Sequence, residues 1–227
     1  MAQLASAPRL GRGGRRFESS HPDQLYMTQV CKIILVRHGE SVFNRQGIIA
    51  GNSPLTPEGR EQARQTKKEL AGFSFDAFYS SDLIRAAETA EIIAGKALPK
   101  ANKLPGLRER DFGSLDMKPS KHHDDDHNKR VTLTQEENWA YKHVDDMESD
   151  HELASRFIGV LQELAEKNAG KTILVAAHGA AIRTTLMKLL GLTYHEIPHG
   201  SFKNAGYVEL TYADNKFKVV HAPGVRI

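Results

Sequence analysis

The sequence has a single cysteine, no long apolar run and little excess charge, and each scarcity excludes a class of protein. Because Cys31 stands alone among 227 residues, an internal disulfide is excluded, and we expect it to be a small buried side chain. No apolar stretch approaches the roughly 20 residues that span a bilayer. The formal net charge of +3 is too small to indicate a nucleic acid or an anionic membrane as the partner. We therefore expect a soluble, cytoplasmic protein.

Residues 1–26 differ from the rest of the chain. They carry arginines among glycines and small residues, and they show no hydrophobic period. Because they contain no apolar segment, they do not look like a secretory signal. Their composition leaves organelle targeting open, although a leader from a vector or an upstream start, with Met27 as the natural start, has at least equal support. We expect the folded domain to comprise residues 27–227.

Apolar runs of strand length alternate with helical patterns along that domain. Strands are expected at 32–36, 76–79 and 172–177, and a hairpin at 208–212 and 217–220. Helices are expected from Thr56 as N-cap to about 70, from Ser80/Ser81 with Asp82 in the first turn, from Ser149 through Leu164, and from about 180 to 190. This alternation predicts a three-layer α/β/α sandwich with a mostly parallel central sheet and an antiparallel edge.

Residues 112–148 lack regular periodicity, and we expect them to form an inserted lid over the site. They include a polar stretch at 121–127 in which His122, His123 and His127 accompany three aspartates. These side chains could bind a divalent metal, but their spacing matches no strong motif. The expected structure of 121–127 is a solvated loop without a metal.

Two of the predicted strands lead into a histidine and a glycine. Residues 32–36 are followed by Arg37, His38 and Gly39, and the strand at 172–177 is followed by His178-Gly179. In an open parallel sheet, ligands bind in the crevice beyond the carboxyl ends of the strands. Both histidines are therefore expected at one edge of the sheet.

These residue types suit phosphoryl transfer. A neutral imidazole such as His38 can attack phosphorus when a backbone carbonyl near Gly39 holds its other ring nitrogen. Arg37 and Arg85 offer guanidinium forks for the phosphoryl oxygens, and Asn44 adds a neutral donor. Taken alone, each remains ambiguous: the histidine could be an ordinary loop residue, and Arg85 could be a solvated arginine paired with Glu88 or Glu91.

Five stretches nevertheless occur together in one order. They are Val36–Ser41 with Asn44; Leu55–Gly59; Ser80–Leu83 with Arg85, Ala86, Glu88 and Thr89; Leu107–Glu109 with Phe112 and Gly113; and Ala177–Gly179. With these motifs, which extend over about 30–223, the chain resembles the histidine phosphatase superfamily in its phosphoglycerate-mutase-like branch. The resemblance implies a phosphoglycerate-mutase-like fold and a phosphohistidine intermediate.

The resemblance also implies a role for each matching position. His38 corresponds to the nucleophile, and the phosphoryl group would be held by Arg37, Asn44, Arg85, His178 and the backbone at and after Gly179. Glu109 corresponds to the proton donor, which must be protonated in the reactive complex. Without the family match, Glu109 would be interpreted as a loop carboxylate paired with Arg108 or Arg110.

The family divides into phosphatases and mutases, and several positions favour a phosphatase. Phe43 stands where mutases typically carry tryptophan, and Glu109–Gly113 resembles the phosphatase version of the acid segment. Lys129-Arg130 could imitate the adjacent lid arginines of the mutases, but the alignment there is loose. Residues 114–119 depart from the phosphatase pattern, which leaves the substrate open.

We therefore predict a phosphomonoester hydrolase that forms a phosphohistidine on a small phosphorylated metabolite. The first alternative is a 2,3-bisphosphoglycerate-dependent phosphoglycerate mutase. A protein Ser/Thr phosphatase and a non-catalytic phosphate-binding scaffold are further alternatives. No metal or cofactor is expected apart from 2,3-bisphosphoglycerate in a mutase, no nucleic acid or membrane partner is expected, and a homodimer remains open.

Overall fold

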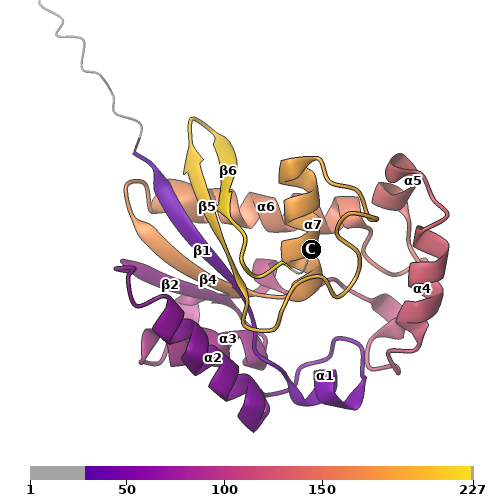
Figure 1. Ribbon diagram of the computed structural model, residues 1–227, viewed down its shortest axis with the longest axis horizontal. Coiled ribbons are helices and arrows are strands. Elements are labelled where there is room, and N and C mark those ends of the chain that lie inside the picture. The colour runs from indigo at the N-terminus through magenta and orange to yellow at the C-terminus, as the bar shows by residue number, and fades with distance from the viewer. Residues whose placement is uncertain (1–28, 226–227) are drawn as a thin grey trace, which may run out of the picture.

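The computed structural model describes residues 29–225, without the side chains of 122–124, so the expected leader at 1–26 lies outside the described residues. A six-stranded sheet of order β3-β2-β4-β1-β5-β6 forms the centre of the molecule (Figure 1). The parallel strands are β1 (Cys31–Arg37), β2 (Ala77–Ser81), β3 (Lys103–Leu104) and β4 (Thr172–Ala177). The hairpin of β5 (Tyr207–Ala213) and β6 (Lys216–His221) adds the antiparallel edge. The predicted fold class is confirmed.

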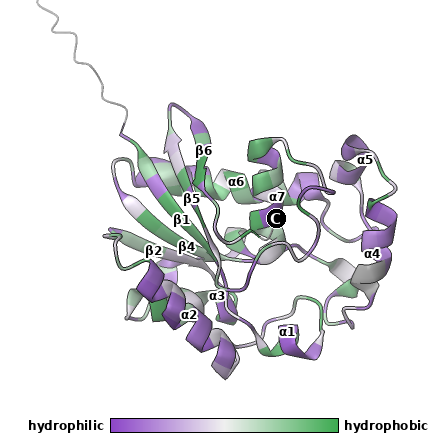
Figure 2. Ribbon diagram, in the orientation of Figure 1, coloured by the Kyte–Doolittle hydropathy of each residue, from purple (hydrophilic) through white to green (hydrophobic). Residues whose placement is uncertain are grey.

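Helices cover both faces of the sheet. Ile33 and Leu35 of β1 belong to the apolar cluster formed with α6 (Asp150–Lys167) and α7 (Gly179–Leu190). Ile34 and Val36 belong to a second cluster, which includes residues of α3 (Ile84–Ala94) and Leu70 at the end of α2 (Pro57–Glu69). Successive side chains of a strand point to opposite faces, so a strand that is buried on both faces is continuously apolar. Figure 2 shows this hydrophobic centre and the polar outer side of α2.

Several predicted helix ends are present in the structure. The Thr56 hydroxyl accepts a hydrogen bond from the Gly59 amide at 3.0 Å at the start of α2. Ser149 and Glu152 form a reciprocal capping box at the start of α6. Gly191, with φ +67°, ends α7 in the left-handed region that glycine adopts readily.

The start of α3 differs from the prediction. The helix begins at Ile84 with Leu83 as N-cap, so Ser80 and Ser81 do not start it and Asp82 is not in its first turn. Instead, β2 continues through Ser81 because it pairs with β3, a strand too short to be recognised from the sequence.

The region 112–148 is more regular than expected. It contains η3 (Gly113–Leu115), α4 (His122–Arg130) and α5 (Gln135–Ala140), so the loop predicted at 121–127 is mostly helical. Helix α4 has no apolar stripe from which it could be predicted. Its last residue, Arg130, is instead held by ion pairs with Asp126 and Asp150. The side chains of His122 and His123 are outside the described residues, so the prediction of no metal there is not tested.

The remaining elements are short: α1 (Val42–Gln46), η1 (Lys100–Asn102) and η2 (Pro105–Leu107). Cys31 is fully buried, as expected, and burial together with the nearby Asp76 carboxylate raises the pKa of its thiol to about 11. Within residues 29–225, none of the helices combines the length and the apolar character that crossing a membrane requires.

Candidate active site

The two His-Gly pairs meet at the carboxyl edge of the sheet. Strands β1 and β4 are adjacent and parallel, with Arg37 opposite Ala177, so the residue after each strand lies beside the other. The His38 amide donates to the Ala177 carbonyl at 2.9 Å. The rings of His38 and His178 pack edge to face, with their centroids 5.2 Å apart. The structure therefore brings the two predicted histidines together.

The contacts of His38 define its tautomer. Its Nδ1 lies 2.6 Å from the Gly39 carbonyl oxygen, which can only accept, so Nδ1 carries the proton. Its Nε2 lies 3.1 Å from Nε of Arg85, which can only donate, so Nε2 carries the lone pair. Burial, with the cations of Arg85 and Arg37, holds the pKa of His38 well below 6.5. The ring is therefore neutral near pH 7, with a nucleophilic nitrogen at Nε2.

Gly39 is required by a close approach of two backbone segments. A Cβ at Gly39 would lie 2.2 Å from the carbonyl oxygen of Gly59, in the first turn of α2. The Gly39 amide also donates to the Thr89 hydroxyl of α3 at 3.1 Å. The turn that presents His38 is thus fixed by contacts with two helices, α2 and α3.

Arg85 forms its hydrogen bonds within the site and is not part of a surface ion pair. Besides His38, it donates through Nη1 to the Gly51 carbonyl at 2.6 Å, and the residue is 2 % exposed. Glu88 pairs with Arg60 and Glu91 pairs with Lys103, so neither carboxylate neutralises Arg85. A buried guanidinium against the nucleophile is suited to an anionic substrate.

Arg37 and Asn44 complete this side of the site. Arg37 donates to the carbonyl of Phe202, and a Cβ at Gly179 would lie 3.1 Å from its Nε, so this glycine permits close packing against α7. Asn44 accepts from the Ser41 amide through Oδ1 at 3.2 Å in the capping box of α1. The amide NH₂ of Asn44 thereby remains the donor end of the side chain.

Glu109 occupies the N-terminus of α7. Its carboxylate accepts hydrogen bonds from the amides of Ala180 and Ala181, each at 3.1 Å, and from the amide of Arg110 at 2.9 Å. The helix start that we expected to face a substrate anion therefore holds an anion of the chain itself. Arg108 pairs with Asp82, and the Arg110 side chain pairs with Asp150, so the alternative ion pairs of Glu109 are absent.

His178 lies deeper than its proposed role suggests. It is fully buried, and neither ring nitrogen has a hydrogen-bond partner within residues 29–225. Burial and the cations of Arg85 and Arg37 hold its pKa well below 6.5, with a contribution from His38. His178 does not line the cavity described below, and its predicted contact with the phosphoryl group stays a prediction.

A cavity of about 280 Å³ joins most of these groups. Its wall includes Arg37, His38, Asn44, Arg85, Glu109 and Gly179, all of which were selected from the sequence. It also includes Arg183, His199, Ser120 and Phe202, which were not. Helical spacing could have indicated Arg183, because it lies four residues after Gly179 in α7. The loop residues His199 and Phe202 carry no comparable signal.

Comparison with known proteins gives concordant matches. The profile of the Histidine phosphatase superfamily (branch 1) matches residues 33–223. The chain is 32 % identical to the uncharacterized phosphatase PhoE of Bacillus subtilis, over 85 % of this chain and 93 % of that one. It is 31 % identical to the probable phosphoglycerate mutase GpmB of Yersinia enterocolitica, over 82 % and 87 %. A phosphoserine phosphatase variant from Entamoeba histolytica, solved with phosphoserine, superposes with a TM-score of 0.70 at 28 % identity, over 85 % and 96 %.

Proposed function

The chain belongs to the histidine phosphatase superfamily, and from this premise we propose that it hydrolyses small phosphomonoesters through a phosphohistidine at His38. It is an enzyme, since its relatives are phosphatases and probable phosphoglycerate mutases. The observation that carries the proposal is the preformed lone pair of His38 Nε2 beside Arg85, at a cavity that Glu109 also lines.

The first half of the reaction forms the phosphohistidine. Nε2 of His38 attacks phosphorus while the bond from phosphorus to the ester oxygen breaks, and Glu109 gives its proton to the leaving oxygen. The Nδ1 hydrogen bond to Gly39 supports the positive charge that develops on the ring. Arg37, Arg85 and Asn44 hold the equatorial oxygens, where the transferred group carries its charge.

The second half restores the free enzyme. The Glu109 carboxylate takes a proton from water, the water oxygen bonds to phosphorus, and the bond from phosphorus to Nε2 breaks. Glu109 must begin the cycle protonated, because it supplies the proton to the leaving oxygen. In the unliganded site the carboxylate is held by the amides of Ala180 and Ala181.

Two features support hydrolysis over transfer to a sugar acid. Arg130 is 1 % exposed and pairs with Asp126 and Asp150, while Lys129 is exposed, and neither lines the cavity. The pair therefore does not act as the lid arginines of a mutase would. Glu109 also borders a second cavity of about 710 Å³ that His38 does not line, and water in this cavity could reach the acid.

The alternatives have less support. The relationship to probable mutases favours phosphoglycerate mutase as the second candidate, with 2,3-bisphosphoglycerate as its priming compound. The cavity of about 280 Å³ fits a small metabolite better than a protein segment. A non-catalytic scaffold would have no need for a nucleophilic nitrogen at His38 in the same cavity as a carboxyl group at Glu109.

The test follows two reactions in parallel. Wild-type protein is incubated with p-nitrophenyl phosphate, and separately with 3-phosphoglycerate in the presence and absence of 2,3-bisphosphoglycerate, beside a His38→Ala variant. We expect phosphate release that requires His38 and no formation of 2-phosphoglycerate. Interconversion of the phosphoglycerates stimulated by bisphosphoglycerate would replace the proposal with the mutase, and inactivity in both assays would support the scaffold.

A further inference from the structure

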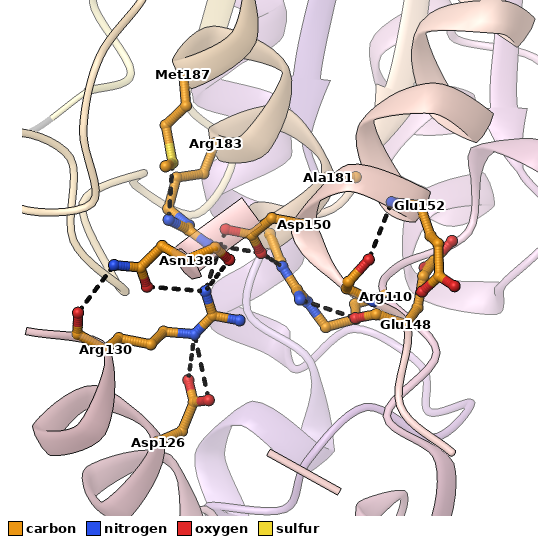
Figure 3. Close-up of polar contacts among 12 residues, drawn as sticks. Arg110, Asp126, Arg130, Asn138, Glu148, Asp150, Glu152, Ala181, Arg183 and Met187 are labelled. Atoms are coloured by element: carbon orange, nitrogen blue, oxygen red, sulfur yellow. Dashed lines mark hydrogen bonds and ion pairs between the residues drawn. The ribbon is translucent and has the colours of Figure 1, made fainter. Parts of the chain in front are cut away.

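Figure 3 shows a buried cluster of charged side chains, one of which, Arg183, also lines the active-site cavity. At its centre Asp150, on α6, is approached by three arginines from different segments. Arg110 bonds to its Oδ1, Nη1 of Arg130 lies 3.2 Å from its Oδ2, and Nη2 of Arg183 lies 3.7 Å from its Oδ1. Asp126 adds a second carboxylate, 3.1 Å from Nε of Arg130.

The carboxylates in this cluster are unevenly shared. Three almost entirely buried guanidinium groups share two carboxylates in these ion pairs, and the nearby Glu109 carboxylate acts on Arg110 but not on Arg183. A buried charge is costly unless it is paired and hydrogen-bonded. The arginine with the weakest partners should therefore either bear an incompletely compensated charge or bind an anionic ligand.

Arg183 is that arginine. It is 4 % exposed, its Nε has no hydrogen-bond partner within residues 29–225, and its Nη1 meets only neutral acceptors: the Met187 sulfur at 3.0 Å and the Ile197 carbonyl at 3.4 Å. Burial lowers the pKa of Arg183, and Asp150 only partly offsets it because Arg110 and Arg130 repel. The same carboxylate raises the pKa of Arg110 despite its burial.

Arg183 also borders the cavity that contains His38. It lies one helical turn after Gly179 and Ala180, and all three residues line that cavity. The proposed reaction uses the nitrogen of His38 and the cations of Arg37 and Arg85, and it assigns nothing to Arg183. An under-compensated guanidinium at the wall of a substrate cavity is an anion-binding group.

We propose that Arg183 binds a carboxylate carried by the substrate, so that the enzyme selects phosphorylated acids; this rests on the phosphatase function proposed above. A carboxylate matches the single positive charge of Arg183, whereas a second phosphate dianion would exceed it. The cavity of about 280 Å³ lies near the lower limit for small-molecule pockets, which favours a compact acid.

The test uses two substrates that differ only in the carboxylate, O-phosphoserine and O-phosphoethanolamine. The measured quantity is the ratio of their kcat/KM values in wild type and in Arg183→Met, Arg183→Lys and Arg64→Met. Arg64 is the matched control, because it pairs with Glu61 on the surface of α2, away from the cavity. Turnover of p-nitrophenyl phosphate by wild type checks the phosphatase function separately.

We expect the wild type and Arg64→Met to prefer phosphoserine by about 10- to 100-fold, the range for a hydrogen bond between charged groups. Arg183→Met should bring the ratio close to 1, and Arg183→Lys, which keeps the charge without the planar fork, should retain part of the preference. A wild-type ratio near 1, or an unchanged ratio in Arg183→Met, would overturn the inference.

A folding defect would not obscure the result. If circular dichroism shows that Arg183→Met is unfolded, the wild-type ratio and that of Arg183→Lys decide, and equal ratios in those two proteins refute the role of Arg183. Hydrolysis of p-nitrophenyl phosphate together with a wild-type ratio near 1 would refute only the carboxylate site. Absence of hydrolysis of every phosphomonoester would refute the phosphatase function and the site together.

Discussion

Nε of Arg85 lies 3.1 Å from Nε2 of His38, and this contact determines which nitrogen of the ring is available for attack. A guanidinium can only donate, so the lone pair of Nε2 faces the cation that would hold the phosphoryl group. The proton is kept on Nδ1 by the Gly39 carbonyl. The nucleophile is thus preorganised in the unliganded protein, and no change of tautomer is needed before attack.

The two buried histidines should make stability depend on pH below neutrality. Folding lowers the pKa of His38 and of His178, so the unfolded chain binds more protons than the folded one as the pH falls below about 6.5. We expect each histidine to remove about 1 kcal/mol of stability between pH 7.5 and 5.5. Urea unfolding of wild type and of His38→Asn at both pH values measures this.

The change in unfolding free energy between pH 7.5 and 5.5 should differ between wild type and the histidine variants in a defined direction. His38→Asn should lose about 1 kcal/mol less than wild type over the same interval, because one of the two linked groups is gone. His178→Asn should behave in the same way. Equal losses in wild type and both variants would show that these rings are protonated alike in the folded and unfolded states.

Glu109→Gln should separate substrates by their leaving groups. An alkoxide needs a proton as it leaves, whereas p-nitrophenolate does not, so kcat/KM for phosphoethanolamine should fall by about 10²- to 10⁴-fold and that for p-nitrophenyl phosphate much less. The glutamine keeps an acceptor for Ala181 but turns an NH₂ toward the Ala180 amide, which should cost about 1 kcal/mol of stability.

Steady-state kinetics on both esters, with Glu61→Gln on the surface of α2 as the control, provides the measurement. The control should leave both values unchanged, since Glu61 is exposed and pairs with Arg64. Equal losses on the two esters in Glu109→Gln would argue for a binding role and against proton donation.

The fold could be predicted from the sequence wherever a local rule determined the structure. The apolar runs at 32–36 and 172–177 predicted buried parallel strands, which the structure contains. Thr56 and Ser149 cap helices through their own side chains, as their positions in the sequence predicted. The pairing of β2 with β3 could not be foreseen, because a strand of two residues has no periodicity. Helix α4 was missed for a related reason: it is held by ion pairs and shows no apolar stripe.

The site could be predicted to the extent that strand ends and family motifs select residues. The sequence indicated His38, Arg85 and Glu109, and the structure places all three on one cavity wall, while their catalytic roles stay predictions. The N-terminus of α7 was expected to face a substrate, but the partner of its amides is Glu109. The cluster around Asp150 was not foreseeable, since its three arginine partners, Arg110, Arg130 and Arg183, come from separate segments.

Gly39→Ala should be among the most destabilising small substitutions in the chain. The added Cβ would lie 2.2 Å from the Gly59 carbonyl oxygen, which belongs to the backbone of α2 and cannot rotate away. We expect a loss of about 3 kcal/mol or more in the free energy of unfolding, together with displacement of His38. Gly72→Ala is the matched control, because nothing lies within 4 Å of a Cβ there.

Denaturant unfolding of the two alanine variants tests this difference. Gly72→Ala should stay within about 0.5 kcal/mol of wild type, as is usual for surface positions. If Gly39→Ala were equally mild, the turn after β1 would have to be able to move away from α2 without loss of packing.

Asp150→Asn should destabilise the protein strongly, because one carboxylate is shared by three buried arginines. The substitution leaves Arg110, Arg130 and Arg183 buried without the carboxylate that they share, and removing one partner of a buried ion pair costs about 3–5 kcal/mol. Asp125→Asn, at an exposed position of the same insert, is the control and should stay within about 0.5 kcal/mol.

The effect should also depend on pH in a predictable direction. Burial alone would raise the pKa of Asp150, but Arg110, Arg183 and Arg130 lower it from 3.8 to about 2. Its stabilising contribution, about 2 kcal/mol by linkage, is therefore complete above pH 3.8 and is lost as the pH falls toward 2. The stability difference between wild type and Asp150→Asn should shrink over that interval. A difference independent of pH would show that these three arginines do not lower the pKa of the Asp150 carboxyl group.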